Sequence, residues 1–235
     1  MRLLLGVTGG IAAYKAADLV SQAVKAGFEV RVVMTPSATH FVGPLTFEAL
    51  SGHPVMLDAL ATGGAPEGSG AVQHISWAKW ATHACIAPLS AASLGKLACG
   101  ISDNALTTVW LALPPGIVNV LAPAMNTQMW DHPIVQRNVK WLEESGRYTV
   151  LSPTSKRLAC GDVGTGALPE VADLLAALTG APTPPPQKVA PPTKAASAAP
   201  IPLPPVAAPT PRPATPPAAG PAPIPAIPKK GPGFR

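Results

Sequence analysis

The sequence of 235 residues predicts an α/β protein with a doubly wound parallel sheet, followed by a disordered tail. Short, nearly continuous apolar runs alternate with segments of helical periodicity, which is typical of a parallel sheet covered by helices on both faces. Small and hydroxyl-bearing residues follow several of these runs, and the composition changes abruptly near residue 180. The pattern indicates a Rossmann- or flavodoxin-like domain whose ligand crevice lies beyond the carboxyl ends of the strands.

The N-terminal half begins with an apolar run at residues 2–8, which predicts a strand that ends at two glycines. Residues 11–27 repeat apolar side chains at helical spacing and stop at a glycine, so they predict a helix. Residues 28–35 read FEVRVVMT, a run rich in β-branched side chains that predicts the second strand. The stretch 61–72 has almost no side chains able to pack, and we expect it to be a mobile loop.

The C-terminal half continues the same alternation. Residues 83–89 (HACIAPL) and 116–123 (GIVNVLAP) predict two buried strands, and residues 148–153 (YTVLSP) predict the last one. Apolar side chains at helical spacing, closed by glycines, predict helices between and after these strands. The expected helices are 90–100, 132–146 and 169–180.

Residues 181–235 differ in composition from the rest of the chain. They hold 20 of the 31 prolines and no Asp or Glu, so they cannot bury enough apolar surface to offset their ordering entropy. We expect a folded domain at 1–180 and a disordered Pro/Ala-rich tail at 181–235. Six of the 17 Lys and Arg lie in the tail, which leaves 11 in the domain against 12 Asp and Glu. The basic charge therefore gives no ground for a nucleic-acid partner.

Three cysteines, Cys85, Cys99 and Cys160, form no CxxC pair, and such a small odd set is typical of a reducing compartment. Cys85 falls within an expected strand and Cys99 within an expected helix, so we expect both in the core. The N-terminus lacks the cleavage pattern of a signal peptide, and no apolar run approaches the roughly 18 residues of a membrane span. We expect a soluble, cytoplasmic protein without a membrane partner.

Small and hydroxyl-bearing residues cluster at three strand ends. The turn at residues 6–10 (GVTGG) leads into a helix, whose N-terminus favours a phosphate, although a plain tight turn would look the same. Thr35 and Ser37 follow the second strand, and Ser90 and Ser93 follow a later one; their hydroxyls could hold a phosphate or cap helices. Together the three ends predict a mononucleotide whose phosphate lies among helix N-termini and whose ring lies on apolar side chains.

Three further features could carry chemistry. His74 precedes an amphipathic segment, where a lone histidine is usually a cap or a surface residue; no histidine pair has metal-ligand spacing, so we expect no metal. Cys160 lies in the Gly-rich, cation-flanked RLACGDVGTG, which is typical of a reactive thiol. Residues 123–130 (PAMNTQMW) place an amide, Asn126, between two methionines and a tryptophan directly after an apolar strand. A plain turn needs none of these large side chains.

Assembled in order, these segments resemble the homo-oligomeric flavin-containing cysteine decarboxylases. The resemblance covers nearly all of residues 1–175 and rests on GVTGGIAAYKAADLV, HISWAKWA, APLSAASLGKLACGISDN, APAMNTQMWDHP and KRLACGDVGTGALPE. It implies FMN as cofactor and the decarboxylation of 4′-phosphopantothenoylcysteine to 4′-phosphopantetheine in coenzyme A biosynthesis, through a thioaldehyde and an enethiolate. It also implies a homo-oligomer, a trimer or a dodecamer, with the flavin between the subunits of a trimer.

Carried over position by position, the resemblance gives each site residue a role. It implies His74 as the active-site histidine, Asn126 as the group that binds the substrate carboxylate, and Cys160 as the acid that protonates the product. The implied FMN contacts are Gly9, Gly10, Ile11, Thr35, Ser37, Ser90, Ala91, Ala92, Ser93, Ala124 and Met125. The implied substrate contacts beside Asn126 are Met129, Ala159 and Gly161.

The chain departs from the family pattern in two respects. Ala92 stands where many relatives have an asparagine. Many bacterial relatives continue into a synthetase that attaches cysteine to phosphopantothenate, whereas here the Pro/Ala-rich tail follows, so a separate phosphopantothenate–cysteine ligase is the expected partner. Two alternatives stay open: a peptidyl-cysteine decarboxylase, whose relatives lack a matching cysteine loop, and a non-catalytic flavoprotein platform with a tail that docks partners.

Overall fold

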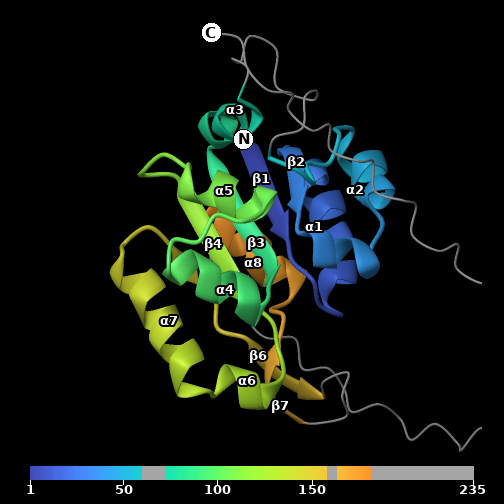
Figure 1. Cartoon of the computed structure of the whole chain (residues 1–235). Coiled ribbons are helices and arrows are strands. Elements are labelled where there is room, and N and C mark those ends of the chain that lie inside the picture. Colours follow the sequence, from blue (N-terminus) through green and yellow to red (C-terminus); the bar gives the residue numbers. More distant parts are fainter. Residues whose placement is uncertain (60–71, 158–162, 181–235) are drawn as a thin grey trace, which may run out of the picture. The chain divides into compact units, whose positions relative to one another are not determined.

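The computed structural model describes residues 1–59, 72–157 and 163–180, and its centre is a five-stranded parallel sheet (Figure 1). The strand order is β2-β1-β3-β4-β5. The strands are β1 (Arg2–Val7), β2 (Glu29–Met34), β3 (His83–Leu89), β4 (Val118–Pro123) and β5 (Thr149–Val150). The order reverses between β1 and β3, which confirms the flavodoxin-like, doubly wound sheet predicted from the sequence.

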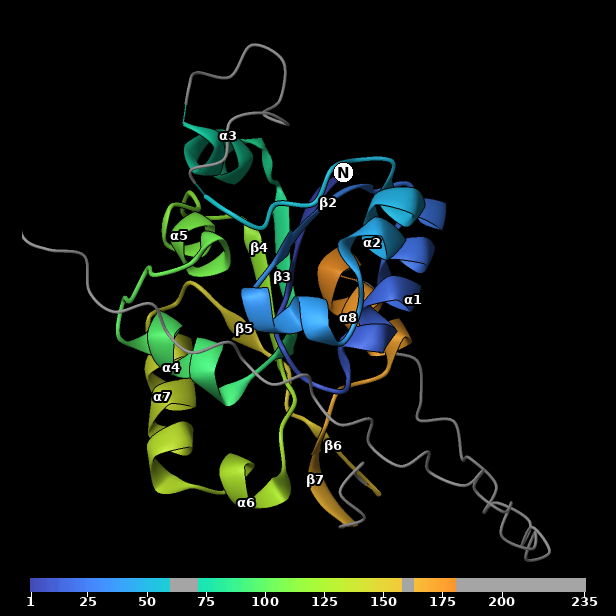
Figure 2. The same cartoon turned by 45° about the vertical axis from the view of Figure 1, so that its right-hand side comes forward.

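Helices cover both faces of this sheet, as the two views in Figures 1 and 2 show. One face carries α1 (Ala13–Lys25), α2 (Pro44–Ser51) and α8 (Val171–Thr179). The other face carries α3 (Gln73–Trp80), α4 (Ala91–Ala98), α5 (Ala105–Leu111) and α7 (Pro133–Glu144). Two short helices follow strand ends: the 3-10 helix η1 (Pro36–His40) after β2 and α6 (Thr127–Trp130) after β4.

Successive side chains of each strand enter two different cores. On β1, Leu3 and Leu5 pack in the core beneath α1, whereas Leu4 packs in the core beneath α5. Cys85 and Ile86 of β3 divide in the same way. Burial of one such aliphatic side chain contributes about 2 kcal/mol. Because both faces are buried, these strands are apolar at nearly every position, which is why the sequence predicts them clearly.

Helix α5 is absent from the elements predicted from the sequence. Three β-branched residues in succession, Thr107 to Val109, lower its intrinsic helix propensity. Tertiary contacts stabilise it instead: Asn104 caps its first turn by accepting a hydrogen bond from the Thr107 amide at 3.1 Å. The buried Trp110 indole donates to Asn119 Oδ1 at 3.2 Å, which satisfies both polar groups inside the core.

The last part of the sheet differs from the expectation. Residues 148–153 were expected to form one strand, but β5 covers Thr149–Val150 alone, and an antiparallel hairpin of β6 (Thr154–Arg157) and β7 (Val163–Ala167) follows it. The hairpin is polar and Gly-rich, without the apolar alternation that marks a half-buried strand. The sequence therefore predicts a loop where the structure has a small second sheet.

The cysteines of the described residues lie in two environments. Cys85 is fully buried on β3, as expected, and burial raises the pKa of its thiol to about 12. The expectation that Cys99 belongs to the core is wrong, because this residue is exposed at the end of α4. Leu94 and Leu97 carry the buried face of that helix, and Cys99 lies outside it.

Parts of the predicted organisation lie outside the described residues. These parts are the tail at 181–235 and, except for the exposed Val72, the loop at 61–72. Across 1–59, 72–157 and 163–180, no helix has the length and apolar character that crossing a membrane requires.

Candidate functional site

A cavity of about 600 Å³ lies at the carboxyl ends of the central strands. Four segments form its walls: the turn after β1, the ends of β3 and β4 with the residues that follow them, and the β6–β7 hairpin with the residues just after it. Its lining residues are Thr8, Gly9, Gly10, Ile11, Ala12, Tyr14, Lys15, Pro88, Ser90, Ala91, Ala124, Met125, Asn126, Met129, Lys156, Gly166, Ala167 and Leu168. The cavity therefore occupies the point where the strand order reverses, at which sheets of this kind bind ligands.

The turn after β1 is held against the end of β3 by one buried hydroxyl. Thr8 Oγ1 donates to the Pro88 carbonyl at 2.7 Å and accepts from the Ser90 amide at 2.8 Å. A Cβ at Gly9 would lie 2.6 Å from Ser37 Oγ, so only glycine allows η1 to approach this closely. A Cβ at Gly10 would meet no protein atom within 4 Å. Because Gly10 lines the cavity, that open space is available to a ligand.

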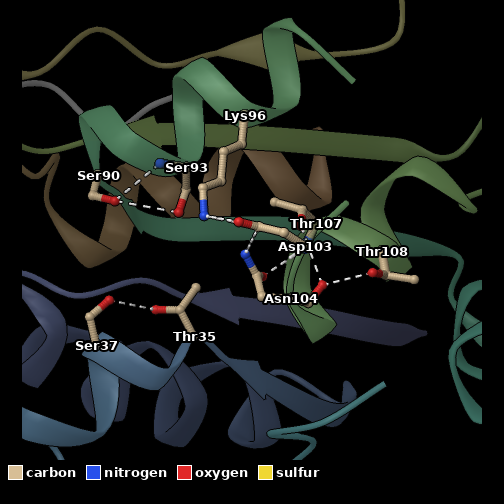
Figure 3. Close-up of polar contacts among 9 residues, drawn as sticks. All are labelled: Thr35, Ser37, Ser90, Ser93, Lys96, Asp103, Asn104, Thr107 and Thr108. Carbon is tan, nitrogen blue, oxygen red and sulfur yellow. Dashed lines mark hydrogen bonds and ion pairs between the residues drawn. The ribbon is translucent and has the colours of Figure 1, made fainter. Parts of the chain in front are cut away.

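The hydroxyl pairs predicted as phosphate contacts follow β2 and β3, which have β1 between them in the sheet; Figure 3 shows both pairs. Thr35 Oγ1 and Ser37 Oγ are 3.2 Å apart. Ser90 Oγ accepts from the Ser93 amide at 3.4 Å and so caps α4, a contact that contributes about 1 kcal/mol. Of the predicted FMN contacts in these segments, Ser90 and Ala91 line the cavity. Those that do not line it are Thr35, Ser37, Ala92 and Ser93.

An ion pair behind these hydroxyls joins α4 to the start of α5 (Figure 3). Lys96 Nζ contacts both carboxylate oxygens of Asp103, at 2.9 and 2.7 Å, and Asn104 Nδ2 donates to the same group at 2.9 Å. The hydrogen bond from Lys96 is the largest of the effects that lower the pKa of Asp103. The exposed pair adds little to stability; it links α4 to the residues just before α5.

Asn126 enters the cavity wall with a fixed orientation. Its Oδ1 accepts a hydrogen bond from the Gln128 amide at 2.8 Å and caps α6. The amide nitrogen, which is the donor that a carboxylate requires, lies on the opposite side of the planar group. Met125 and Met129 line the cavity beside it. The predicted amide between two thioethers is therefore part of the cavity.

The hairpin docks on this segment through two glycines. A Cβ at Gly166 would lie 2.2 Å from the Met125 carbonyl oxygen, and one at Gly164 would lie 2.5 Å from Thr127 Oγ1. The Met125 amide donates to the Gly166 carbonyl at 2.9 Å. Glycine at 166 is thus explained by the close approach of another backbone, and glycine at 164 by the close approach of the Thr127 side chain.

Two lysines are the charged side chains among the described residues that line the cavity. Lys156 of β6 pairs with Glu170, and Lys15 of α1 lies 3.8 Å from the same carboxylate. Burial lowers the pKa of Lys156, the nearby Lys15 lowers it further, and Asp173 opposes the shift. Neither lysine is among the site residues predicted from the sequence. A signal existed for Lys15, since a cation in the first turn of a helix opposes the helix dipole, but Lys156 has no comparable local signal.

His74 lies far from this cavity within one chain. Helix α3, which carries it, lies at the opposite end of the sheet from α6 and the hairpin in both Figures 1 and 2. The His74 side chain is half-buried, and its Nδ1 is 3.4 Å from the Ala59 carbonyl oxygen. The structure therefore does not bring His74 and Asn126 together in a single chain.

The remaining predicted site residues are Ala159, Cys160 and Gly161, and they lie outside the described residues. The strands on either side of them, β6 and β7, are described and contribute Lys156 and Gly166 to the cavity.

Comparison with known proteins places these features in context. The family model described as Flavoprotein matches residues 1–181. A probable phosphopantothenoylcysteine decarboxylase of Streptococcus mutans is 45% identical over 170 residues, which are 72% of this chain and 92% of that protein. The coenzyme A biosynthesis bifunctional protein CoaBC of Bacillus subtilis is 46% identical over 168 residues, 72% of this chain. The chain spans 40% of the length of that bifunctional relative.

Solved structures give the same picture. A cysteine-to-serine mutant of PPC decarboxylase, complexed with pantothenoylaminoethenethiol, superposes with a TM-score of 0.66 at 37% identity, over 76% of this chain and 95% of that one. The FMN-dependent cysteine decarboxylase SpaF superposes with a TM-score of 0.63 at 33% identity, over 77% of this chain and 96% of that one. The similarity in both cases spans nearly the whole of the compared structure.

Proposed function

The chain belongs to the flavoprotein family, and from this premise we propose that it is an FMN-dependent decarboxylase that converts 4′-phosphopantothenoylcysteine to 4′-phosphopantetheine in coenzyme A biosynthesis. The observation that carries the proposal is the single cavity in which the glycine turn after β1 meets Met125, Asn126 and Met129. Such a cavity has one part suited to a flavin nucleotide and another suited to an acid. The choice of substrate is supported by the probable phosphopantothenoylcysteine decarboxylase that is 45% identical to this chain over 92% of its own length.

The cavity fits FMN in size and in chemistry. Its volume of about 600 Å³ lies in the usual range of cofactor sites. The turn at Gly9, Gly10 and Ile11 precedes α1, where a helix N-terminus favours a phosphate, and Gly10 leaves open space beside it. Ala124 and Met125 offer an apolar surface to a ring system. When bound there, FMN supplies the two-electron oxidation and re-reduction of the substrate.

The role of Asn126 follows from its neutral charge. We propose that Asn126 binds the carboxylate of the substrate, because an amide N–H orients a carboxylate without the strong ground-state stabilisation of an ion pair. Met125 and Met129 of the cavity wall exclude water from the same place. A carboxylate that leaves water for an apolar site loses carbon dioxide more readily.

The two cavity lysines suit a phosphorylated substrate. Lys15 and Lys156 share one carboxylate, Glu170, which holds both ammonium groups near the cavity rim. A phosphate monoester is a strong acceptor for such donors. We assign the lysines to the phosphate of the substrate, because the turn before α1 already provides a site for the phosphate of FMN.

We propose that the active protein is a homo-oligomer, a trimer or a dodecamer, and that His74 acts in the cavity of a neighbouring subunit. Within one chain His74 lies at the wrong end of the sheet. Ile11 and Tyr14, which line the cavity, are 62% and 61% exposed. A second copy that covered these apolar side chains would both complete the site and bury exposed surface.

We assign Cys160 as the acid that donates the last proton to the product. Its loop joins β6 to β7, and both strands reach the cavity through Lys156 and Gly166. A cysteine flanked by cations in a Gly-rich segment is suited to proton transfer. This assignment separates the proposed reaction from the oxidative decarboxylation of peptide cysteines, which needs no such proton.

The setting of the reaction follows from its substrate. The substrate contains an amide bond between a carboxylic acid and cysteine, so a phosphopantothenate–cysteine ligase must supply it. We propose the cytoplasm as the location, because Cys85 and Cys99 are both free thiols.

The test uses the full chain purified with its flavin. A yellow protein that releases carbon dioxide from 4′-phosphopantothenoylcysteine and yields 4′-phosphopantetheine, identified by mass, is the expected result. The matched control is Asn126→Asp: aspartate keeps the α6 cap but repels the substrate carboxylate, so flavin should remain bound and carbon dioxide release should stop. A colourless protein, or a yellow one inert to this substrate, would overturn the proposal.

A further inference from the structure

Arg31 of β2 lies between the sheet and helix α3, and its side chain is 12% exposed. The guanidinium carbon is 4.6 Å from the ring centroid of Trp80 and 5.5 Å from that of Trp77. Arg31 Nε is buried and has no hydrogen-bond partner in the part of the chain that the structure describes. Two indole faces of one helix, more than hydrogen bonds, therefore determine where this cation lies.

The charge at this position is costly. Burial lowers the pKa of Arg31, against the raising effect of Glu29, whose Oε1 is 3.7 Å from Arg31 NH2. The same carboxylate oxygen is 3.5 Å from His53 Nε2, so Arg31 and His53 share this contact. An apolar side chain would fill the space without the desolvation cost. The planar guanidinium provides what an aliphatic chain does not, namely a fixed orientation for both indole rings.

Helix α3 packs on the sheet through the same two tryptophans that contact Arg31. It is a short helix, and Val72 at its N-terminus makes no side-chain cap hydrogen bond. Trp77 and Trp80 are its large buried side chains, at 1% and 9% exposure. His74 lies one helical turn before Trp77, on the part of α3 without a cap. A rotation of the two indoles would therefore turn His74 as well.

We propose that Arg31 is a positioning residue for His74: its stacking on Trp77 and Trp80 sets the rotation of α3 and so directs the imidazole. The inference rests on the role of His74 under the proposed function. Arg31 does not line the cavity of its own chain, so we expect its effect on the rate of the chemical step and not on the binding of substrate or flavin. A displacement of about 1 Å of a catalytic group costs up to a hundredfold in rate.

The experiment compares three variants of the flavin-loaded full chain. Arg31→Met removes the stacked cation at similar volume, and Arg31→Lys keeps the charge without the plane. Arg137→Met is the matched control, because Arg137 stacks on Trp141 at 4.5 Å on α7, away from α3. We expect kcat to fall about tenfold or more in Arg31→Met, with KM and flavin content unchanged. The kcat of Arg31→Lys should lie between those of Arg31→Met and wild type, and the kcat of Arg137→Met should equal that of wild type.

A second readout does not depend on activity. The rate at which diethyl pyrocarbonate modifies His74, followed by peptide mass, should change in Arg31→Met and stay constant in Arg137→Met. If Arg31→Met fails to fold, Trp80→Phe takes its place, since it keeps a ring in the core but weakens the cation–π contact.

The outcomes separate this inference from the proposed function. If wild type decarboxylates and Arg31→Met keeps its kcat, the positioning role is overturned. It is equally overturned if kcat, KM and flavin content all deteriorate together, since that pattern marks general loss of structure. If wild type is inert, the proposed function fails, while the change in modification rate at His74 still decides whether Arg31 positions it.

Discussion

Single residues divide the proposed reaction between them. Asn126 has its oxygen engaged in the α6 cap, which leaves its orientation independent of whether substrate is present. Thr8 joins two strand ends through one hydroxyl, so the floor of the cavity is also set in advance. Polar groups that are held before the ligand arrives lower the cost of ordering them during binding. At this scale the site is preorganised by the chain itself.

The assignment of the final proton to Cys160 leads to the first prediction. Cys160→Ser should still release carbon dioxide, because the acid acts after decarboxylation. The product should be the enethiol, lower in mass than 4′-phosphopantetheine by two hydrogen atoms, and high-resolution mass spectrometry would detect it. Formation of normal 4′-phosphopantetheine at the wild-type rate would show that another group supplies the proton.

The cavity lysines lead to the second prediction. Lys15→Gln and Lys156→Gln should each raise KM for 4′-phosphopantothenoylcysteine roughly tenfold or more, the loss of a hydrogen bond to a charged group. Turnover of unphosphorylated pantothenoylcysteine should not change. Steady-state kinetics with the two substrates gives the comparison, and Lys140→Gln, in an exposed pair with Glu144 on α7, is the control.

Glu170→Gln distinguishes a phosphate site from a structural ion pair. If the lysines bind phosphate, removal of the neighbouring negative charge should lower KM for the phosphorylated substrate. If they serve only to pair with Glu170, its loss should reproduce the lysine variants. A fall in flavin content in the lysine variants would instead assign them to the phosphate of FMN.

At the scale of elements, the β6–β7 hairpin forms one wall of the cavity through backbone contact. Gly166→Ala would place a Cβ 2.2 Å from the Met125 carbonyl oxygen, a clash that no side-chain movement relieves. Overpacking of this kind costs about 1–3 kcal/mol. We expect the hairpin to detach from the 123–130 segment, with activity falling more than tenfold.

Gly95→Ala provides the matched control for the hairpin. Its added Cβ would lie 3.7 Å from Asn138 Nδ2, an ordinary contact, and alanine favours the helix by about 1 kcal/mol. Its activity should equal wild type and its melting temperature should rise. Full activity in Gly166→Ala would show that the hairpin can move without affecting the reaction.

The sequence predicts those elements whose local pattern and tertiary role agree. Strands β1 to β4 are apolar at nearly every position because both faces are buried, and α1 has a regular apolar stripe, so all five are evident. The hairpin escapes prediction because Gly166 meets the backbone, and Gly164 a side chain, of a segment distant in the sequence, a requirement that only the fold reveals. Helix α5 escapes because tertiary packing overrides its β-branched run.

The residues of the site also divide into those that the sequence predicts and those that it does not. Gly9, Gly10, Ser90 and Asn126 follow strands directly, and the rule that parallel strands end at one edge brings them to one cavity. Lys156 could not be predicted, because its place depends on how the hairpin folds back. The distance of His74 from the cavity follows from the same rule, because α3 ends just before β3 begins and so lies at the amino ends of the parallel strands.

At the scale of the whole molecule, the proposed role of His74 leads to a site built from two chains. His74→Asn and Asn126→Asp should each be inactive alone, since each lacks one group. When the two variants are co-expressed, a mixed oligomer would contain cavities with Asn126 from one subunit and His74 from its neighbour. About a quarter of the wild-type activity should return. In a random, equal mixture half of the cavities have an intact Asn126, and half of those receive an intact His74 from the neighbouring subunit. Decarboxylation rates of the purified mixture, compared with the two variants mixed after separate purification, measure this recovery. Absence of recovery in a mixed oligomer of confirmed composition would place His74 and Asn126 in the same subunit's reaction, and α3 would then have to move across the sheet to reach it.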